Sequence, residues 1–503
     1  MNSSSLLPLL VVLGSLLPAI IIFKLPEKSV RIRTVLNLAG AILKLVLVGW
    51  MLWGVTQGYT YEARLVLLPN IELVLRADPL ALFFVTLSAC LWLLTTIYAI
   101  GYLEDEPHRS RFFGFFSLCV TAAIGVAMAG NLLTFLLFYE LLTLTTYPLV
   151  VHRGNEAARK AGQTYLMYTL GGGSLMLLGT VWLYTLTGSL EFTAGGFVSG
   201  LGVEHHAALI IIFFLLMIGL GVKAALVPLH GWLPKAMVAP APVSALLHAV
   251  AVVKAGAFGI IRVIYEVYGV EFAQQLNLLL PLAIWASITI VWGSLLAVFQ
   301  EDLKKRLAYS TVSQVSYIAL GTALFGPIGT IGGIVHLVHQ GVMKITLFFG
   351  AGNYAETLGI YKIRDMNGAG RRMPVTSLSF SIAALGMMGA PLTAGAVTKY
   401  WLKDGAAAAQ MDWVIWVLWI STALNAIYFL PILWRLWLLP APAQWPSKVT
   451  AANPWPVTPW QLLLPPALTG FVVIAFGILA MYDVGPIVWA QFIAEREYLN
   501  MTP

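Results

Sequence analysis

Apolar runs of about 20 residues recur along the whole chain, and short polar segments separate them. Each run is long enough to cross roughly 30 Å of hydrocarbon. Because that medium offers the backbone no water, each run has to form a helix. The pattern predicts fourteen spans, followed by a short polar tail at residues 483–503. The spans lie near residues 6–23, 34–55, 79–99, 112–129, 132–151, 163–186, 207–227, 241–265, 277–299, 308–325, 328–350, 374–400, 412–434 and 460–482.

The composition supports an all-α, polytopic membrane protein with a single transmembrane domain over residues 1–503. Of the 503 residues, 59% are hydrophobic and 10% are charged, whereas roughly 25% are charged in a typical soluble domain. Cys90 and Cys119 fall inside apolar runs, without the spacing of metal ligands. The N-terminal segment MNSSS lacks the basic region of a cleavable signal peptide. Because no haem, iron–sulfur, quinone or nucleotide motif is found, we expect no cofactor and no metal.

Basic residues divide unevenly between the two sets of loops. If the N-terminus lies outside, the cytoplasmic loops hold 19 Lys and Arg residues and the opposite loops hold 4. Such a bias is typical of membrane proteins whose basic loops stay inside. We therefore expect a multi-pass protein of the cell inner (plasma) membrane with both termini outside. This placement also explains the net charge of +7 without any binding to nucleic acid.

Ionisable residues also occur inside the predicted spans, where a charge at the bilayer centre costs at least about 2.5–3.5 kcal/mol. A chain keeps such residues where they pair internally or line a wet path. Lys44 has no obvious partner, and Arg262 lies near a span end, from which its side chain can reach the interface. The seven residues are Lys44, Glu140, Lys223, Lys254, Arg262, Lys344 and Lys399.

Glu140 is the only acidic residue in the predicted spans, and Thr143 and Tyr147 share its helical face. A static structural ion pair is the alternative to a functional carboxylate here. Lys223 lies near the end of span 7, before Pro228, which removes a backbone donor and weakens the helix. Broken helices at membrane depth are tolerated where they are buried in protein or line a cavity.

Histidines and lysines are concentrated in and beside spans 7, 8 and 11. In span 11, His336, Gln340 and Lys344 form one helical stripe. A neutral histidine titrates near physiological pH and suits a proton relay, whereas a metal site is less favoured because this helix has no Cys or carboxylate. The candidate residues for a proton or ion pathway in this set are His230, His248, Lys254, His336, His339 and Lys344.

Span 12 repeats the features of span 7, because it combines Gly386, Pro391 and Gly395 with Lys399. The two spans are five spans apart, and an odd offset inverts the orientation in the membrane. The pattern therefore predicts two inverted five-helix repeats with broken helices 7 and 12. The repeats cover 112–267 (spans 4–8) and 277–437 (spans 9–13), span 3 and its loop cover 75–110, and peripheral helices cover 1–56 and 460–503.

Several segments resemble the antiporter-like membrane subunits shared by complex I, membrane-bound hydrogenases and Mrp-type sodium/proton antiporters. The segments are FYELL around Glu140, PLHGWLPKAMVAPAPVSALLHAVAVVKAG at 228–256, EDLKKRLAYSTVSQVSYIALG at 301–321 and HLVHQGVMK at 336–344. The resemblance covers roughly residues 75–435. It implies an ion-translocating subunit that has no redox site of its own and assembles with other membrane subunits in the bilayer.

The resemblance also implies roles for individual residues along one pathway. The matches are Glu140 and Lys223 for an ion pair, Lys254 for a bridging lysine, His336 and His339 for linking histidines with Lys344 just beyond, and Lys399 for the terminal position of span 12. One complex I subunit type has glutamate at that last position, so Lys399 favours the other types. The segment ALNAIYFLPILWRLW at 423–437 resembles the Mrp D and hydrogenase branch.

We therefore expect a proton-translocating subunit of an Mrp-type cation/proton antiporter, with Na⁺ as the candidate exchanged ion. The chain lacks the extra helices of the longest family members, which argues against the complex I subunit 5 and Mrp A types. A proton-pumping subunit of a complex I-like NADH/quinone oxidoreductase or of a membrane-bound hydrogenase is the alternative. A more distant alternative is a secondary transporter for a solute other than an ion, which predicts a sizeable central cavity.

Overall fold

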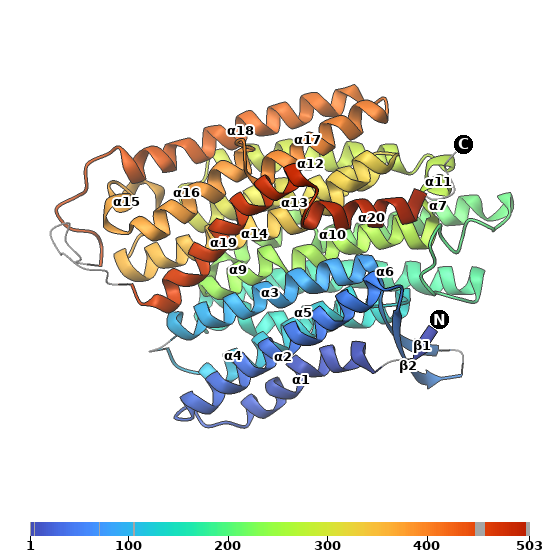
Figure 1. Cartoon of the computed structure of the whole chain (residues 1–503), viewed down its shortest axis with the longest axis horizontal. Coiled ribbons are helices and arrows are strands. Elements are labelled where there is room, and N and C mark those ends of the chain that lie inside the picture. The colour runs from blue at the N-terminus through green and yellow to red at the C-terminus, as the bar shows by residue number, and fades with distance from the viewer. Residues whose placement is uncertain (1, 5, 70, 104–105, 448–457, 499–503) are drawn as a thin grey trace.

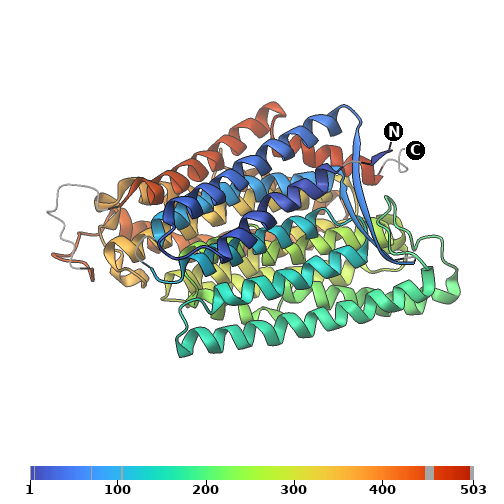
Figure 2. The ribbon, with the colours of Figure 1, turned by 90° about the horizontal axis from the view of Figure 1, so that it is seen from below.

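The computed structural model describes residues 2–4, 6–69, 71–103, 106–447 and 458–498. Long helices lie side by side along one direction and form a bundle (Figures 1 and 2). The α-helices are α1 (Leu7–Phe23), α2 (Val30–Thr56), α3 (Pro79–Tyr102), α4 (Arg109–Ala127), α5 (Leu132–Val150), α6 (Glu156–Thr187), α7 (His206–Lys223), α8 (Trp232–Lys235), α9 (Ala241–Ala249), α10 (Val252–Arg262), α11 (Val270–Gln275), α12 (Leu279–Val298), α13 (Leu303–Ala323), α14 (Pro327–Leu358), α15 (Ala369–Arg372), α16 (Pro374–Met388), α17 (Ala394–Ala408), α18 (Asp412–Trp437), α19 (Trp460–Leu479) and α20 (Pro486–Tyr498). Shorter helical turns are η1 (Val203–His205), η2 (Leu229–Gly231), η3 (Ala236–Val238), η4 (Val263–Tyr268), η5 (Ile363–Asp365) and η6 (Ala480–Tyr482).

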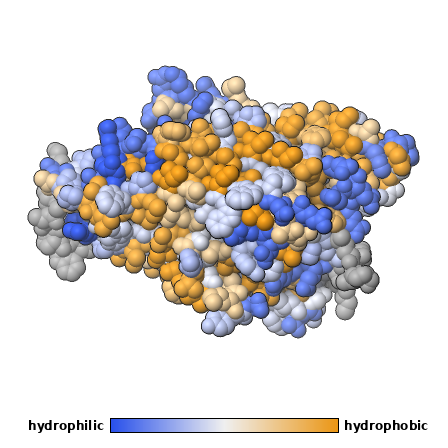
Figure 3. Space-filling view, turned by 90° about the horizontal axis from the view of Figure 1, so that it is seen from above, coloured by the Kyte–Doolittle hydropathy of each residue, from blue (hydrophilic) through white to orange (hydrophobic). Residues whose placement is uncertain are grey.

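The helices have the length and composition of membrane spans. Within the described residues, eleven helical segments are long and apolar enough to cross a membrane, and α1 and α16 are shorter apolar helices. In the space-filling view, hydrophobic residues cover much of the middle of the face, and hydrophilic residues gather toward its left and right ends (Figure 3). Each of the fourteen predicted spans contains helix, which confirms the polytopic helical class. The number fourteen stays a prediction.

The core of the bundle is built around α14. This helix packs against α3, α9, α13, α16, α17, α19 and α20, and the apolar stretch of α14 is completely buried. The stretch Ala241–Tyr268, which contains α9, α10 and η4, is also completely buried. The polar residues predicted in spans 8 and 11 therefore lie inside the protein and away from lipid.

A small sheet caps one end of the bundle, in a segment that the sequence analysis treats as a plain loop. Strand β2 (Thr60–Leu68) pairs antiparallel with β3 (Ile71–Ala77), and β1 (Asn2–Ser4) pairs parallel with β2. Arg64 Nη2 lies 2.7 Å from Glu191 Oε1, and Arg76 Nε lies 2.7 Å from Glu62 Oε2. Burial alone would raise the pKa of Glu62, but hydrogen bonds from both arginines hold that pKa below its usual value. We call this side of the bundle the sheet end.

The helices of spans 7 and 12 are interrupted, as the prolines predict. After Lys223, where α7 ends, the chain continues through η2, α8 and η3 before α9 begins. Trp232 Nε1 donates a 2.7 Å hydrogen bond to the carbonyl oxygen of Val222, which the break leaves free. Helix α16 ends at Met388 and α17 begins at Ala394, after Pro391. The interruptions are observed, whereas the inverted repeat that they suggest stays a prediction.

Span 8 contains a further break that the sequence analysis treats as continuous helix. Helix α9 ends at Ala249 and α10 begins at Val252. Ala251 has φ −92° and ψ −98°, outside the helical region. Neither proline nor glycine marks this place, so the pattern of apolar residues gives no sign of it. His248 and Lys254 consequently belong to two different helices.

Two predictions near the sheet end are wrong. The sequence predicts a polar tail at residues 483–503, but α20 packs against α14 and α3. The sequence also predicts that Arg262 reaches the membrane interface, but it is buried, with Nη1 2.8 Å from Asp78 Oδ2 and an ion pair to Glu266. Arg496 of α20 also pairs with Glu266, at 2.6 Å. Oppositely charged groups from distant parts of the chain thus hold α20 and α10 together, and Glu266 is a second acidic residue in a helical span.

Candidate functional site

Glu140 and Lys223 form the predicted ion pair. Glu140 projects from α5, and Lys223 is the last residue of α7, with Nζ 4.0 Å from Glu140 Oε1. The lysine is completely buried, and 29% of the glutamate side chain is exposed. Lys223 Nζ donates to the carbonyl oxygen of Tyr139 and lies over its ring, 3.3 Å from the ring centre. The lysine is therefore held mainly by Tyr139, and the carboxylate is at the outer limit of an ion pair.

Glycines of α6 make room for this pair. A Cβ built on Gly173 would lie 2.6 Å from Cδ of Glu140, and one built on Gly172 would lie 2.8 Å from the side chain of Val222. The triplet Gly171-Gly-Gly173 therefore serves close helix packing. Glu140 Oε1 and Thr143 Oγ1 are buried and have no hydrogen-bond partner in the described part of the chain. The carboxylate is free to change its hydrogen bonds without breaking a strong one.

Lys254 and His248 lie deep in the protein on either side of the unexpected break. Both are completely buried, and neither Lys254 Nζ nor the ring nitrogens of His248 has a hydrogen-bond partner among the described residues. The His248 ring stacks on Phe348 of α14, with ring centres 4.4 Å apart. Buried polar groups are nearly always hydrogen-bonded, so water is the natural partner for these atoms.

Helix α14 places its two predicted histidines toward different neighbours. His336 packs beside Tyr317 of α13, with ring centres 5.1 Å apart. His339 Nδ1 is 3.0 Å from Thr398 Oγ1 of α17. Both ring nitrogens of His336 and Nε2 of His339 have no protein partner within the described ranges. The histidines therefore bridge α13 and α17.

Lys344 lies on the same helix but is held apart from the histidines. Its Nζ donates to Ser310 Oγ and, at 3.3 Å, to the carbonyl oxygen of Leu307, both on α13. Gln340, one turn before Lys344 on the same helix, is completely buried, and its amide has no partner in the described structure. The predicted stripe of polar residues on α14 is therefore buried along its length.

Lys399 closes the broken span 12. Its Nζ donates to the carbonyl oxygen of Met388 at 2.9 Å and to Thr422 Oγ1 at 2.8 Å. Met388 ends α16, so the ammonium group satisfies a carbonyl that the break leaves without an intrahelical partner. Asn425 Nδ2 satisfies the neighbouring carbonyl of Met387 at 2.9 Å.

Electrostatic interactions connect several of these groups across helix boundaries. Lys254 interacts with Lys344, and His336 interacts with Lys254, His339 and Lys399. Helix α10 reaches the end of α7 through Gly256, where a Cβ would lie 2.8 Å from the backbone carbon of Lys223. No hydrogen bond or ion pair of the described residues joins Lys223 directly to Lys254.

His230 occupies a separate position among the predicted residues. It lies in η2 and is partly exposed, with its ring 6.1 Å from that of Tyr309 on α13. No hydrogen bond or ion pair of the described residues joins it to Lys223. His230 is therefore beside the broken span 7 but not within the row of completely buried groups.

Several hydrogen-bonding residues of the site are not singled out by the sequence. They are Tyr139, Ser310, Tyr317, Thr398, Thr422 and Asn425. Hydroxyl and amide residues are common in membrane helices, so composition alone does not distinguish these. Their only signal is the place of some of them within segments 301–321 and 423–437. Within the described ranges, no three His, Cys, Asp or Glu residues converge as metal ligands.

The chain matches known proteins over most of its length. The family model described as NADH:quinone oxidoreductase/Mrp antiporter, TM, matches residues 129–425, and one described as NADH-Ubiquinone oxidoreductase (complex I), chain 5 N-terminus, matches residues 69–113. NADH-quinone oxidoreductase subunit N of Desulforudis audaxviator is 32% identical over 418 residues, which cover 81% of this chain and 82% of that protein. A fused subunit of a probable K(+)/H(+) antiporter of Rhizobium meliloti is 32% identical over 69% of this chain, which corresponds to 34% of that longer protein.

Solved structures have the same fold. A chain of an archaeal membrane-bound sulfane sulfur reductase superposes with a TM-score of 0.87 at 23% identity, and the match covers 99% of this chain and 100% of that chain. A chain of the Mrp complex from Dietzia sp. DQ12-45-1b superposes with a TM-score of 0.83 at 22% identity, covering 97% and 98%. The family match over 129–425 and the relatives above establish that this chain belongs to the NADH:quinone oxidoreductase/Mrp antiporter family of membrane subunits.

Proposed function

We propose that this chain moves protons across the membrane as one subunit of a multisubunit Mrp-type cation/proton antiporter or a related complex. The observation that carries the proposal is the set of buried ionisable residues on α5, α7, α10, α14 and α17. Each such residue is costly within a bilayer, and several of their polar atoms have no protein partner in the described structure. Groups of this kind suit protons that move through water.

The ion pair between Glu140 and Lys223 acts as the switch in this proposal. Its 4.0 Å separation leaves the carboxylate close enough to stabilise the ammonium group but without a hydrogen bond to it. In a protein interior a unit charge acts over several ångströms with much less screening than in water. A movement of Glu140 therefore changes the free energy of a proton on Lys223 and, through α10, on Lys254.

The relay continues from Lys254 to His336 and His339 and ends at Lys399. His336 interacts electrostatically with the other three groups, and His339 contacts α17 through Thr398. Lys344 with Ser310, and His248 beside Phe348, lie next to this line and modulate it by their charge. His230 is assigned to the entry side at the broken span 7.

A redox-driven proton pump is the second candidate. The 32% identity with an NADH-quinone oxidoreductase subunit N favours it, whereas the identity with part of a probable K(+)/H(+) antiporter favours the first candidate. Because the ion pathway would be the same in both, the partner subunits decide between them. In either case the chain itself supplies proton transfer, and any redox chemistry belongs to the partners.

We also propose the orientation and the internal symmetry. Both termini lie outside, and the cell inner membrane holds the chain, which the excess of basic residues in alternate loops supports. Residues 112–267 and 277–437 form two inverted repeats, which the breaks after Lys223 and Met388 support.

Membrane vesicles that contain the purified complex test the proposed function. A dye that reports internal pH follows a preformed proton gradient while Na⁺ or K⁺ is added, and in a second assay NADH and a quinone are added. Collapse of the gradient by a cation identifies an antiporter, and formation of a gradient by NADH identifies a pump. An intact complex that does neither contradicts the proposal.

A further inference from the structure

The last membrane-spanning segment is also broken. Helix α19 ends at Leu479, η6 follows, and Asp483 adopts the left-handed conformation with φ 51° and ψ 49° before α20 begins at Pro486. The two red helices α19 and α20 are offset from each other part of the way along the bundle (Figures 1 and 2). Near the end of α19, Gly477 packs directly on the backbone of Leu392, inside the break of span 12. The two breaks are therefore neighbours.

The break lies at membrane depth, by two separate measures. Tyr498, the last residue of α20, shares a hydrogen bond with Thr330 and accepts one from the N–H of Gly326, at the start of α14. A helix of 13 residues is about 20 Å long, so α20 begins about that far from the start of α14. Pro486 also lines a cavity together with Thr86, which lies seven residues, or about 10 Å, into α3. Both measures place residues 480–485 within the hydrocarbon.

This irregular backbone is exposed on the flank of the bundle. Met481 is 69% exposed and Tyr482 is 72% exposed, and Asp483, Val484 and Gly485 are exposed as well. Asp483 forms no hydrogen bond or ion pair with any described residue. Irregular backbone does not face lipid within the hydrocarbon, because its N–H and C=O groups would lack partners. A carboxylate at the same depth adds a further cost.

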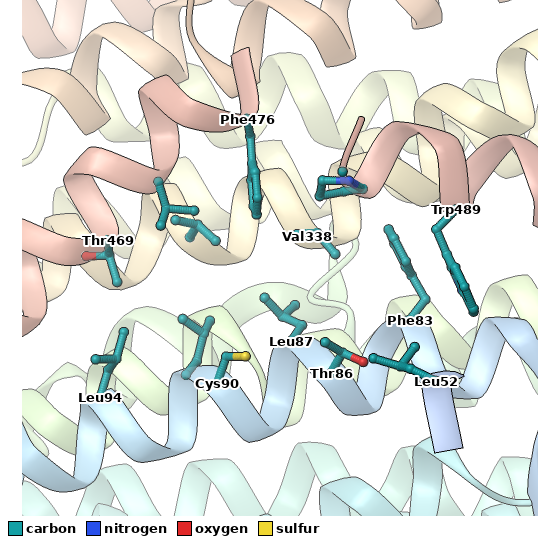
Figure 4. Close-up of a pocket in the computed structure, with 15 residues that line it drawn as sticks. Leu52, Phe83, Thr86, Leu87, Cys90, Leu94, Val338, Thr469, Phe476 and Trp489 are labelled. Atoms are coloured by element: carbon teal, nitrogen blue, oxygen red, sulfur yellow. The ribbon is translucent and has the colours of Figure 1, made fainter. Parts of the chain in front are cut away.

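A cavity of about 370 Å³ lies beside the break. Phe83, Leu87 and Cys90 of α3 form one wall, and Phe476 and Trp489 of the C-terminal helices face them (Figure 4). The lining is almost entirely apolar. The ring of Phe476 also lies 5.8 Å from that of His339. Whatever fills the cavity therefore touches a residue that packs on the proposed proton pathway.

We propose that a membrane-spanning helix of a partner subunit covers this flank, with an apolar side chain in the cavity and a basic or amide side chain opposite Asp483. A lipid acyl chain would fill the cavity equally well, but it offers no hydrogen-bond donor to the carboxylate or to the broken backbone. A partner helix supplies both kinds of contact. The assignment concerns assembly and stands independently of whether the complex exchanges Na⁺ or is driven by redox chemistry.

Photo-crosslinking at Tyr482 in the assembled complex identifies what covers the flank. A benzophenone amino acid replaces this exposed residue, the complex is irradiated in native membranes, and the adduct is analysed by gel electrophoresis and mass spectrometry. We expect an adduct with one membrane subunit of discrete mass. An adduct with lipid alone overturns the proposal.

Charge reversal at Asp483 tests the second half of the proposal. Asp483→Lys is compared with Asp483→Asn and with Glu204→Lys, an exposed acidic residue at the sheet end. We expect Asp483→Lys to reduce the amount of crosslinked partner that co-purifies by about tenfold, because an opposed buried charge loses its pair. Asp483→Asn should lower it less, and Glu204→Lys should leave it unchanged. Equal co-purification of Asp483→Lys and the unmodified chain, at equal amounts of each in the membrane, overturns the assigned contact.

Discussion

A side chain at position 173 would collide with the carboxylate of Glu140, because a Cβ built on Gly173 lies 2.6 Å from Cδ of that glutamate. The carboxyl group of α5 therefore occupies space that α6 leaves open only by having glycine there. Lys223 lies on the other side of the same carboxyl group, 4.0 Å away. The ion pair thus depends on three helices, and its geometry can be changed from α6 without altering either charge.

Gly173→Ala should reduce proton transport several-fold and leave the amount of assembled complex nearly unchanged. The added methyl group meets the far end of a flexible side chain, so Glu140 can move aside at little cost in folding free energy. The displaced carboxylate then no longer faces Lys223 at the observed distance. Transport is measured by the pH dye in vesicles and normalised to subunit content.

Gly171→Ala is the matched control for this change. A Cβ at position 171 has no atom within 4 Å, and alanine favours helix as much as or more than glycine. We expect normal transport from this variant. Equal transport by Gly171→Ala and Gly173→Ala would mean that the position of the Glu140 carboxylate does not matter.

Proline and charge make much of the fold predictable from the sequence. Pro228 and Pro391 cannot donate a backbone hydrogen bond, and helices are interrupted next to both. The break near Ala251 is not predictable, because alanine and valine give no local sign of a non-helical backbone. The helix α20 escapes prediction because its charged residues look solvent-exposed, whereas Arg496 is paired with Glu266 of a distant span.

The site is predictable where a charge is unusual and not where a hydroxyl is ordinary. Glu140 and Lys223 are conspicuous in apolar runs, and the structure brings them together. Thr398 and Ser310 hold the ring of His339 and the ammonium of Lys344, but threonine and serine occur throughout the spans. The prediction for Arg262 is wrong because its partner Asp78 is far away in the sequence.

Thr398→Val should slow proton transport without preventing assembly. The substitution keeps the shape of the side chain and removes the 3.0 Å hydrogen bond to His339 Nδ1, so the imidazole loses the group that fixes its orientation. Thr145→Val is the control, because Thr145 Oγ1 bonds only to carbonyl oxygens of its own helix. The initial rate of the dye signal is compared for both variants. Identical rates would remove His339 from the pathway.

Lys399→Met should abolish net transport, since it removes the terminal ammonium group and leaves the carbonyl oxygen of Met388 without its 2.9 Å donor. Lys403→Met, one turn further along α17, removes a lysine that lies over the ring of Trp419 and contacts neither break. We expect normal transport from that control. Thr422→Val should give an intermediate rate, because Lys399 keeps one of its two acceptors. Full transport by Lys399→Met would exclude this residue as the end of the relay.

The sheet end should lose stability in acid. The pKa values of Glu62 and Glu191 in the folded protein are below the usual 4.5, since burial, which would raise them, is outweighed by hydrogen bonds from Arg64 and Arg76. Groups with a lowered folded-state pKa stabilise the protein above the unfolded-state pKa and lose this contribution as the pH falls through the folded-state pKa. Arg64→Gln should therefore lower the Tm by a constant amount above about pH 5, and by progressively less as the pH falls below that value.

The thermal measurement has an internal control on an exposed helix. Lys160 pairs with Glu156 on α6, and both side chains are largely exposed, so Lys160→Gln should change the Tm little at any pH. A Tm difference for Arg64→Gln that stays the same from neutral pH into strong acid would show that the carboxylates of the sheet end do not contribute through their charge.

Glu140→Gln tests the proposed switch most directly. Glutamine keeps the size and hydrogen-bonding capacity of the side chain but removes the charge that stabilises the ammonium group of Lys223, so the pair has only one state left. If the pair were purely structural, loss of one charge would leave a buried uncompensated ion at a cost of roughly 3–5 kcal/mol, and the subunit would fail to assemble. Glu156→Gln, in the exposed first turn of α6, is the control for loss of a carboxylate.

The decisive measurement is ion flux and complex yield determined together in the same vesicles for Glu140→Gln. We predict a normal yield of assembled complex with flux lost, while Glu156→Gln retains both. A lost yield would assign Glu140 and Lys223 to structure alone. Normal yield with normal flux would contradict the central claim that the charge of Glu140 drives proton movement.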